Sequence, residues 1–168
     1  MMAHTNVERN GHQMVTIKEK TVVTTRLTAD CPSHARSDIT VRDVSMTIDE
    51  PLARGGTNLG PSPTETAMAA LLGCSNVIGR KIAEKLGLDV RHMKMSLACE
   101  FDRRGVTLQE EIDIPFQRIH LRVEVEGDVS QSDLQRLSQE LSRYCPVAKL
   151  FRAAGTVIEE EWVVAGSN

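Results

Sequence analysis

SPTETAMAALLGCSNVIGRKIAEKLGL, residues 62–88, predicts a long helix around which the rest of the chain is organised. Ser62 is followed by Pro63 and, three places after the serine, by Glu65, which is a capping box with proline at the first helical position. We therefore expect the helix to begin here. Gly87 marks its end, because glycine adopts the left-handed conformation that terminates helices. About 24 residues at ~1.5 Å each give a rod of roughly 36 Å.

The middle of this helix carries a cysteine in apolar surroundings. Residues 67–78 are apolar or small on nearly every side, which a helix tolerates only when it is buried on most sides. Burial disfavours the thiolate form of Cys74, and the helix dipole does not compensate three turns from the helix start. A reactive Cys74 would need a positive charge from elsewhere in the structure.

Length and composition restrict the classes of function. The 168 residues suit a single domain, and a net charge of −3 gives no reason to expect a nucleic acid or an anionic membrane as a partner. Aromatic residues make up only 3% of the chain, which leaves few platforms for stacking bases. No apolar run reaches the ~18 to 20 residues of a membrane span, and no signal peptide is evident. We expect a cytoplasmic protein.

The cysteines and histidines show no metal-site spacing. The four cysteines are far apart in the sequence, and no two histidines are separated by four residues. The cysteines are Cys31, Cys74, Cys99 and Cys145, and the histidines are His4, His12, His34, His92 and His120. We expect neither a metal nor a cofactor, and a structural disulfide is the less favoured use of the cysteines in a reducing compartment.

The chain before the long helix predicts a tail and a hairpin. Residues 1–12 read as a disordered tail, and 13–28, rich in valine and threonine, as a strand. Residues 38–49 contain two alternating runs whose phase slips between Val41 and Val44, which suggests a β-bulge. We expect these two strands to pair.

The chain after the long helix alternates clearly. Residues 93–101 and 119–125 place apolar side chains at every second position and predict a second hairpin of half-buried strands. An amphipathic helix over 128–145, a short helix over 146–155 and a last strand complete the chain. Because strands and helices cluster instead of alternating, the predicted class is α+β with antiparallel sheet, in a single domain over 13–168.

Cys145 lies in a different local environment from Cys74. It precedes Pro146 at the predicted N-cap of the short helix, where backbone N–H groups and the helix dipole favour a thiolate. Local sequence alone therefore predicts that Cys145 is the more acidic of the two thiols.

Two segments together resemble a known family. GGTNLGPSPTETAMAALLGCS and, some seventy residues later, RYCPVAKL are similar to the two cysteine motifs of the OsmC/Ohr family, and the order of elements agrees over roughly residues 13–164. The resemblance implies an OsmC-like α+β fold, with antiparallel sheets around a long buried central helix in an intertwined homodimer. It also implies a cysteine-based peroxidase of the oxidative stress response.

The resemblance assigns roles to both motif cysteines. Cys74 is similar to the peroxidatic cysteine, which attacks an organic hydroperoxide or hydrogen peroxide, and Cys145 to the resolving cysteine, which then forms a disulfide with it. A dithiol or lipoyl-type reductant would reopen that bond.

The family's carboxylate motif is shifted here. Well-studied members carry a carboxylate directly after the proline of the helix start, where it holds an arginine over the thiolate. In this chain Thr64 occupies that place and Glu65 follows, so Glu65 has two interpretations, a catalytic one and reciprocal capping of Ser62. In this respect the chain resembles the YhfA-type branch of the family. The arginine stays open among three candidates, namely Arg36, Arg42 and Arg54.

Two other functions remain as alternatives on the same scaffold. One is a non-catalytic redox sensor in which the cysteine pair switches conformation, and the other is a binding protein for a small hydrophobic ligand.

The remaining reactive side chains have structural interpretations. Cys99 is expected in the core, Cys31 at the surface of a turn, and residues 159–161, three glutamates, at a solvated strand end.

Overall fold

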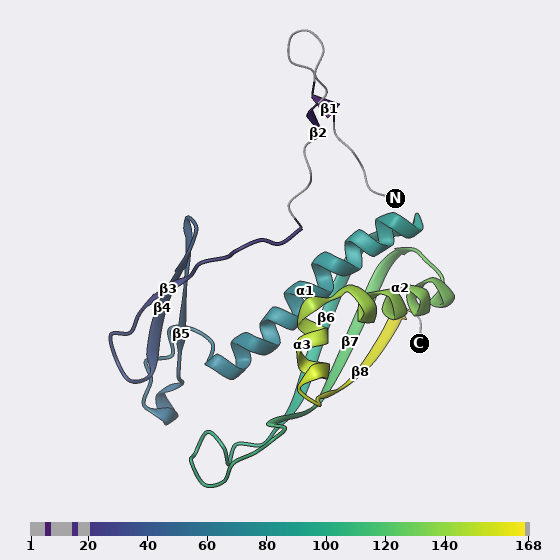
Figure 1. The fold of residues 1–168 in the computed structure, drawn as a ribbon. Helices are drawn as coiled ribbons and strands as arrows, with labels where there is room; N and C mark the ends of the chain where they lie inside the picture. The colour runs from purple at the N-terminus through teal and green to yellow at the C-terminus, as the bar shows by residue number, and fades with distance from the viewer. Residues whose placement is uncertain (1–5, 8–14, 17–20, 167–168) are drawn as a thin grey trace.

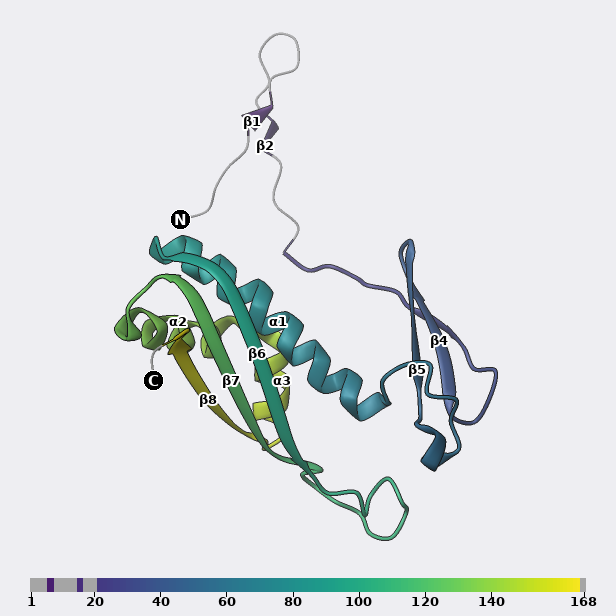
Figure 2. The same ribbon diagram turned by 180° about the vertical axis from the view of Figure 1, so that it is seen from behind.

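The computed structural model describes residues 6–7, 15–16 and 21–166. Three helices pack on one face of a three-stranded sheet, and a second, smaller three-stranded sheet lies beyond the N-terminal end of the longest helix (Figure 1). Figure 2 shows the other face of the larger sheet, which no helix of the described chain covers. The mixed α+β class is confirmed.

The long helix α1 spans Pro63–Leu86 and begins and ends where the sequence predicts. Ser62 and Glu65 form the capping box, and Gly87 closes the helix with a φ of 70°. Within one chain, however, α1 is buried along one face and not on most sides. Leu71, Ser75, Gly79, Ile82 and Ala83 are buried, whereas the opposite side is exposed.

The larger sheet contains β6 (Asp89–Phe101), β7 (Phe116–Asp128) and β8 (Val157–Val164). β6 and β7 form the predicted antiparallel hairpin, with Leu97 opposite Leu121. β8 differs from the expectation of purely antiparallel sheet, because it pairs with β7 in parallel. The helical crossover between β7 and β8 returns the chain to the end of the sheet at which β7 starts, so that both strands run in the same direction.

The core lies between the larger sheet and the helices α2 (Gln131–Tyr144) and α3 (Pro146–Ala153), together with α1. β7 alternates as predicted, with every second side chain buried under the helices. The leucine stripe of α2 meets them and is also fully buried. The buried residues at this contact are Ile119, Leu121, Val123, Val125, Leu134, Leu137 and Leu141.

The smaller sheet corrects two predictions. It contains β3 (Thr28–Asp30), β4 (Arg36–Val41) and β5 (Val44–Asp49), all antiparallel. The strand predicted over 13–28 is wrong for residues 21–27, which form no strand. The phase slip near Arg42 is not a bulge but a tight turn between β4 and β5, in which Arg42 has a φ of 56°.

The first residues of the chain are described only in part. Two short strands, β1 (Asn6–Val7) and β2 (Val15–Thr16), pair with each other. The rest of the predicted tail over 1–12 lies outside the described residues, and so do residues 13–14 and 17–20 of the predicted strand. The tail therefore stays a prediction.

A buried carboxylate connects the smaller sheet to the start of α1. Asp49, fully buried, accepts hydrogen bonds from the backbone N–H of Thr57 (2.9 Å), the Thr57 hydroxyl (2.6 Å) and the N–H of Leu59 (3.1 Å). The Thr57 hydroxyl is the main reason why the pKa of Asp49 lies below its ordinary value. These bonds order the glycine-rich loop, including the short 3₁₀ helix η1 (Leu52–Arg54), that leads into α1.

Within the described ranges, no helix is long and apolar enough to cross a membrane.

Candidate redox site

The two motif cysteines are in contact. The thiol of Cys145 donates to the sulfur of Cys74 over a Sγ–Sγ distance of 2.9 Å, and both thiols are free. Cys74 projects from the middle of α1, and Cys145 lies 71 residues later, between α2 and α3. The fold thus brings together the two residues that the sequence singles out for thiol chemistry.

Cys145 occupies the corner where one helix ends and the next begins. Its backbone N–H donates to the carbonyl of Leu141 at the end of α2, and its sulfur accepts a hydrogen bond from the N–H of Ala148 in the first turn of α3 (3.4 Å). Pro146 is the first residue of α3 and cannot continue α2. The predicted N-cap position is therefore confirmed.

The predicted acidity of Cys145 is wrong. Its side chain is completely buried, and this desolvation is the largest of the effects that raise its pKa to about 11, followed by the hydrogen bond to Cys74. The N–H groups of Ala148 and Val147 act in the opposite direction but are outweighed. Burial, which local sequence does not reveal, therefore keeps the proton on Cys145.

The two sulfurs differ in access to solvent. Cys74 is half-buried, whereas Cys145 is fully buried against the core. A small solute can therefore reach Cys74 first.

Glu65 acts as a helix cap in this structure. Its carboxylate accepts hydrogen bonds from the backbone N–H (2.7 Å) and the hydroxyl (2.8 Å) of Ser62, and these bonds hold its pKa below the ordinary value. Glu65 precedes Cys74 by nine residues, which is about 13 Å along a helix axis. The capping interpretation is confirmed, and a catalytic role for Glu65 remains a prediction.

The three candidate arginines lie in or beside the smaller sheet. Arg36 pairs with Asp38 (2.8 Å), and Arg54 pairs with Glu50 (2.5 Å). Arg42 occupies the turn between β4 and β5. In the part of the chain that the structure describes, none of the three forms a hydrogen bond with Cys74, so the choice among them stays open.

The other two cysteines have the environments that the sequence predicts. Cys99 packs half-buried against the core, and desolvation followed by the charge of Glu100 raises its pKa. Cys31 is exposed, with its sulfur 3.5 Å from the hydroxyl of Ser37. Across the described segments, no three His, Cys, Asp or Glu side chains are grouped so that they could hold a metal ion.

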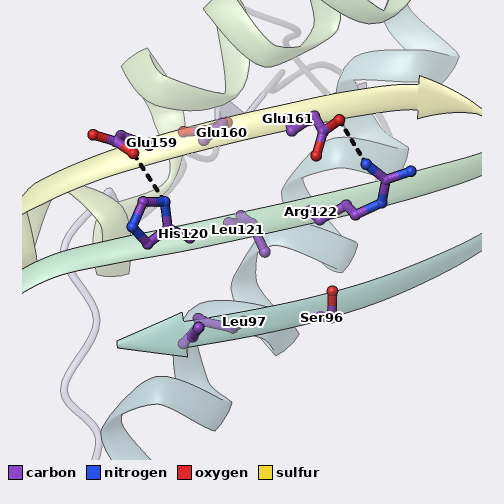
Figure 3. Close-up of a pocket in the computed structure, with 9 residues that line it drawn as sticks. Ser96, Leu97, His120, Leu121, Arg122, Glu159, Glu160 and Glu161 are labelled. Carbon is purple, nitrogen blue, oxygen red and sulfur yellow. Dashed lines mark ion pairs between the residues drawn. The ribbon is translucent and has the colours of Figure 1, made fainter. Parts of the chain in front are cut away.

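A shallow hollow lies on the outer face of the larger sheet (Figure 3). Its volume is about 370 Å³, and it is lined by paired charges. His120 Nδ1 lies 2.8 Å from Glu159, and Arg122 Nη1 lies 2.5 Å from Glu161. Because side chains alternate across a strand, this face is opposite the helices and the cysteines. The hollow is therefore separate from the redox site.

The middle glutamate of residues 159–161 corrects the expectation of a solvated strand end. The Glu160 side chain is only 8% exposed and faces the helices. Its carboxylate accepts hydrogen bonds from Arg152 Nη2 (2.8 Å), Ser138 Oγ (3.0 Å) and Trp162 Nε1 (3.1 Å). Parity would have indicated this, because Glu160 alternates in phase with Ile158 and the buried Trp162.

Comparison with protein families gives one match over more than half of the chain. The profile of the family described as "OsmC-like protein" matches residues 56–161, a region that includes α1 and both motif cysteines. No curated protein matches the sequence significantly.

Several solved structures share the fold. An OsmC-like protein from Mycoplasma pneumoniae is similar with a TM-score of 0.68 at 15% identity, over 85% of this chain and 96% of that one. The organic hydroperoxide resistance protein OsmC from Legionella pneumophila is similar with a TM-score of 0.62 at 16% identity, over 86% of this chain and 98% of that one. For the organic hydroperoxide resistance protein OhrB of Bacillus subtilis the TM-score is 0.56 at 18% identity, over 83% of this chain and 98% of that one. At these identities the likeness establishes the fold.

Proposed function

Because the chain belongs to the OsmC-like protein family, we propose that it is a thiol-dependent peroxidase that reduces organic hydroperoxides or hydrogen peroxide through Cys74 and Cys145. The observation that carries the proposal is the 2.9 Å contact between the two sulfurs. A disulfide needs Cα atoms within ~7 Å, and two side chains whose sulfurs already touch require little movement to form it. The names of the similar Legionella and Bacillus proteins point to organic hydroperoxides as substrates.

In the first step the half-buried thiol reacts. The Cys74 thiolate attacks the terminal oxygen of the hydroperoxide, an S–O bond forms and the O–O bond breaks. The departing oxygen takes up a proton and leaves as an alcohol, or as water when the substrate is hydrogen peroxide. Cys74 is then a sulfenic acid.

In the second step the buried thiol resolves this intermediate. The Cys145 sulfur attacks the Cys74 sulfur, so that an S–S bond forms and the S–O bond breaks. The proton that Cys145 keeps, because burial raises its pKa to about 11, leaves with the oxygen as water. A dithiol or lipoyl-type reductant then returns both cysteines to thiols and is itself oxidised to a disulfide.

A homodimer completes the proposal. The exposed side of α1 carries apolar and small residues, including Val77, which is 51% exposed, and Gly73, beside which an added β-carbon would meet no atom within 4 Å. Such a face can approach a second helix closely. In a dimer the partner subunit could also bring a positive charge to Cys74, with which no arginine of the described residues forms a hydrogen bond.

Steady-state kinetics test the proposal. With cumene hydroperoxide and dithiothreitol, the wild-type protein is expected to consume peroxide over many turnovers. Cys74→Ser should remove this activity, whereas Cys99→Ser, which changes a thiol outside the site, should keep it. Absence of turnover by the wild-type protein with cumene hydroperoxide and with hydrogen peroxide would contradict the proposal.

The redox sensor is the second candidate. It is favoured by Thr64, which occupies the position of the family's carboxylate, and by the absence of an arginine bonded to Cys74 among the described residues. A sensor would form one disulfide per chain with peroxide but would not cycle when a dithiol is present. Single-turnover oxidation without sustained peroxide loss would therefore select the sensor.

A further inference from the structure

Glu160 binds two helices that meet at Cys145. Its carboxylate accepts hydrogen bonds from Ser138 of α2 and Arg152 of α3. Ser138 precedes Cys145 by seven residues and Arg152 follows it by seven, so the two contacts flank the corner that carries the buried thiol. A single carboxylate on β8 thereby fixes both arms of this corner.

The same carboxylate is connected to the helix that carries Cys74. Trp162, buried and hydrogen-bonded to Glu160 through Nε1, packs its ring towards α1. A β-carbon placed on Gly79, five residues after Cys74, would lie 3.7 Å from Cη2 of this indole. Glu160 therefore contacts α2 and α3 directly and α1 through Trp162, and these are the three helices that position Cys74 and Cys145.

The burial of Glu160 is costly without these partners. A carboxylate removed from water is tolerated when it is paired and hydrogen-bonded, and here three donors from three elements supply that compensation. Loss of Arg152 would leave the Glu160 charge unpaired, and loss of Glu160 would do the same to Arg152, so the arrangement favours one relative orientation of α2, α3 and β8.

We propose that Glu160 and Arg152 are positioning residues that hold Cys145 against Cys74 and thereby set the rate and equilibrium of disulfide formation between them. This inference rests on the proposed two-cysteine chemistry. Neither residue contacts the reacting atoms. They act on the second step, in which Cys145 must reach the Cys74 sulfur, and leave the first step, attack of Cys74 on peroxide, unchanged.

The equilibrium of the cysteine pair tests this separately from peroxidase activity. Oxidised dithiothreitol converts the two thiols to the Cys74–Cys145 disulfide and becomes reduced dithiothreitol, and mass spectrometry of alkylated peptides gives the equilibrium constant. Arg152→Met and Glu160→Gln are expected to lower this constant, and the rate of disulfide formation, ten- to hundredfold, as small misplacements of reacting groups do. Arg152→Lys keeps the positive charge, so its equilibrium constant and its rate of disulfide formation should both be close to those of the wild-type protein.

The matched control is Glu161→Gln, one residue away on the outer face of the same strand, where Glu161 pairs with Arg122. It should leave the equilibrium constant unchanged. The first step is measured in a Cys145→Ser background as the rate at which Cys74 becomes a sulfenic acid with cumene hydroperoxide. Arg152→Met should not alter that rate. Melting curves followed by circular dichroism show whether each variant is folded under the assay conditions, which separates unfolding from misplacement. Ser138→Ala is a milder variant, because it removes one hydrogen bond to Glu160 but keeps both charges, and it should lower the equilibrium constant less than Arg152→Met does.

Several results would overturn the inference. One is an equilibrium constant for the Cys74–Cys145 disulfide that is unchanged in Arg152→Met and Glu160→Gln. Another is a decrease of this constant in Glu161→Gln as large as in those two variants. A third is a wild-type protein in which oxidised dithiothreitol forms no disulfide between Cys74 and Cys145. A wild-type pair that forms the disulfide with oxidised dithiothreitol but not with hydroperoxide would instead contradict only the proposed peroxidase function.

Discussion

At the scale of single residues, Cys145 shows why local sequence does not determine thiol chemistry. Its position before Pro146 predicts a helix N-cap, and the structure has it there. The same position suggested an acidic thiol, but the side chain is completely buried and its pKa is about 11. The backbone donors of α3 are visible in the sequence, whereas the core side chains that exclude water come from other elements.

The proton on Cys145 can be followed by thiolate absorbance at 240 nm. The difference between the wild-type protein and Cys145→Ala should show the Cys145 thiolate appearing only near pH 11. In a Cys74→Ala background the pKa of Cys145 should fall, because the hydrogen bond to Cys74 is lost. It should stay above its ordinary value of 9.0, because burial is the larger cause.

The sign of the linked stability change follows from the same shift. Between pH 9 and 11 the unfolded chain releases the Cys145 proton while the folded chain keeps it, so raising the pH through this range lowers the free energy of unfolding. A Cys145 difference spectrum with its midpoint at or below pH 9 would contradict both the burial of this thiol and its role as proton carrier.

At the scale of elements, caps and alternation predicted most of the fold. Both ends of α1, the β6–β7 hairpin and the two C-terminal helices were predicted because their signals are local. The strand over 13–28 was not found in residues 21–27, because valine and threonine favour a strand only where a neighbour pairs with it. The parallel β7–β8 pairing depends on where the crossover places β8, and alternation carries no such information.

The cap of α1 provides a test at this scale. Ser62→Ala removes the hydroxyl that bonds to Glu65, and we expect the free energy of unfolding to fall by about 1 kcal/mol, measured by urea denaturation. Ser130→Ala, in the equivalent capping box of α2, should have a similar effect. Ser142→Ala, whose hydroxyl bonds to Gln139 within its own helix, should be close to neutral. Equal stability of Ser62→Ala and the wild-type protein would contradict the capping role.

At the scale of the whole molecule, the sequence and the single chain disagree about α1. Its apolar composition predicts burial on most sides, but only one face is buried within the chain. A second copy on the exposed face would reconcile the two. The candidate site is affected as well. The family resemblance of the two motifs identified the cysteine pair, but it could not choose among the arginines, and none of the described arginines forms a hydrogen bond with Cys74.

The exposed face of α1 gives a prediction about assembly. We expect the wild-type protein to sediment as a dimer at micromolar concentration and Val77→Asp to shift it to monomer, because a charge would be buried in an apolar contact. Leu108→Asp is the matched control, since Leu108 is an exposed apolar residue in the β6–β7 loop, 93% exposed. A monomeric wild-type protein would show that α1 does not form this contact.

The most direct test of the account is the bond that forms when the reduced protein meets one equivalent of cumene hydroperoxide. Peptide mass spectrometry after alkylation should show Cys74 joined to Cys145, with Cys31 and Cys99 still alkylated as free thiols. In Cys145→Ser the same treatment should leave Cys74 as a sulfenic acid. Recovery of Cys74 and Cys145 as free thiols while peroxide persists, or oxidation confined to Cys31, would contradict the account.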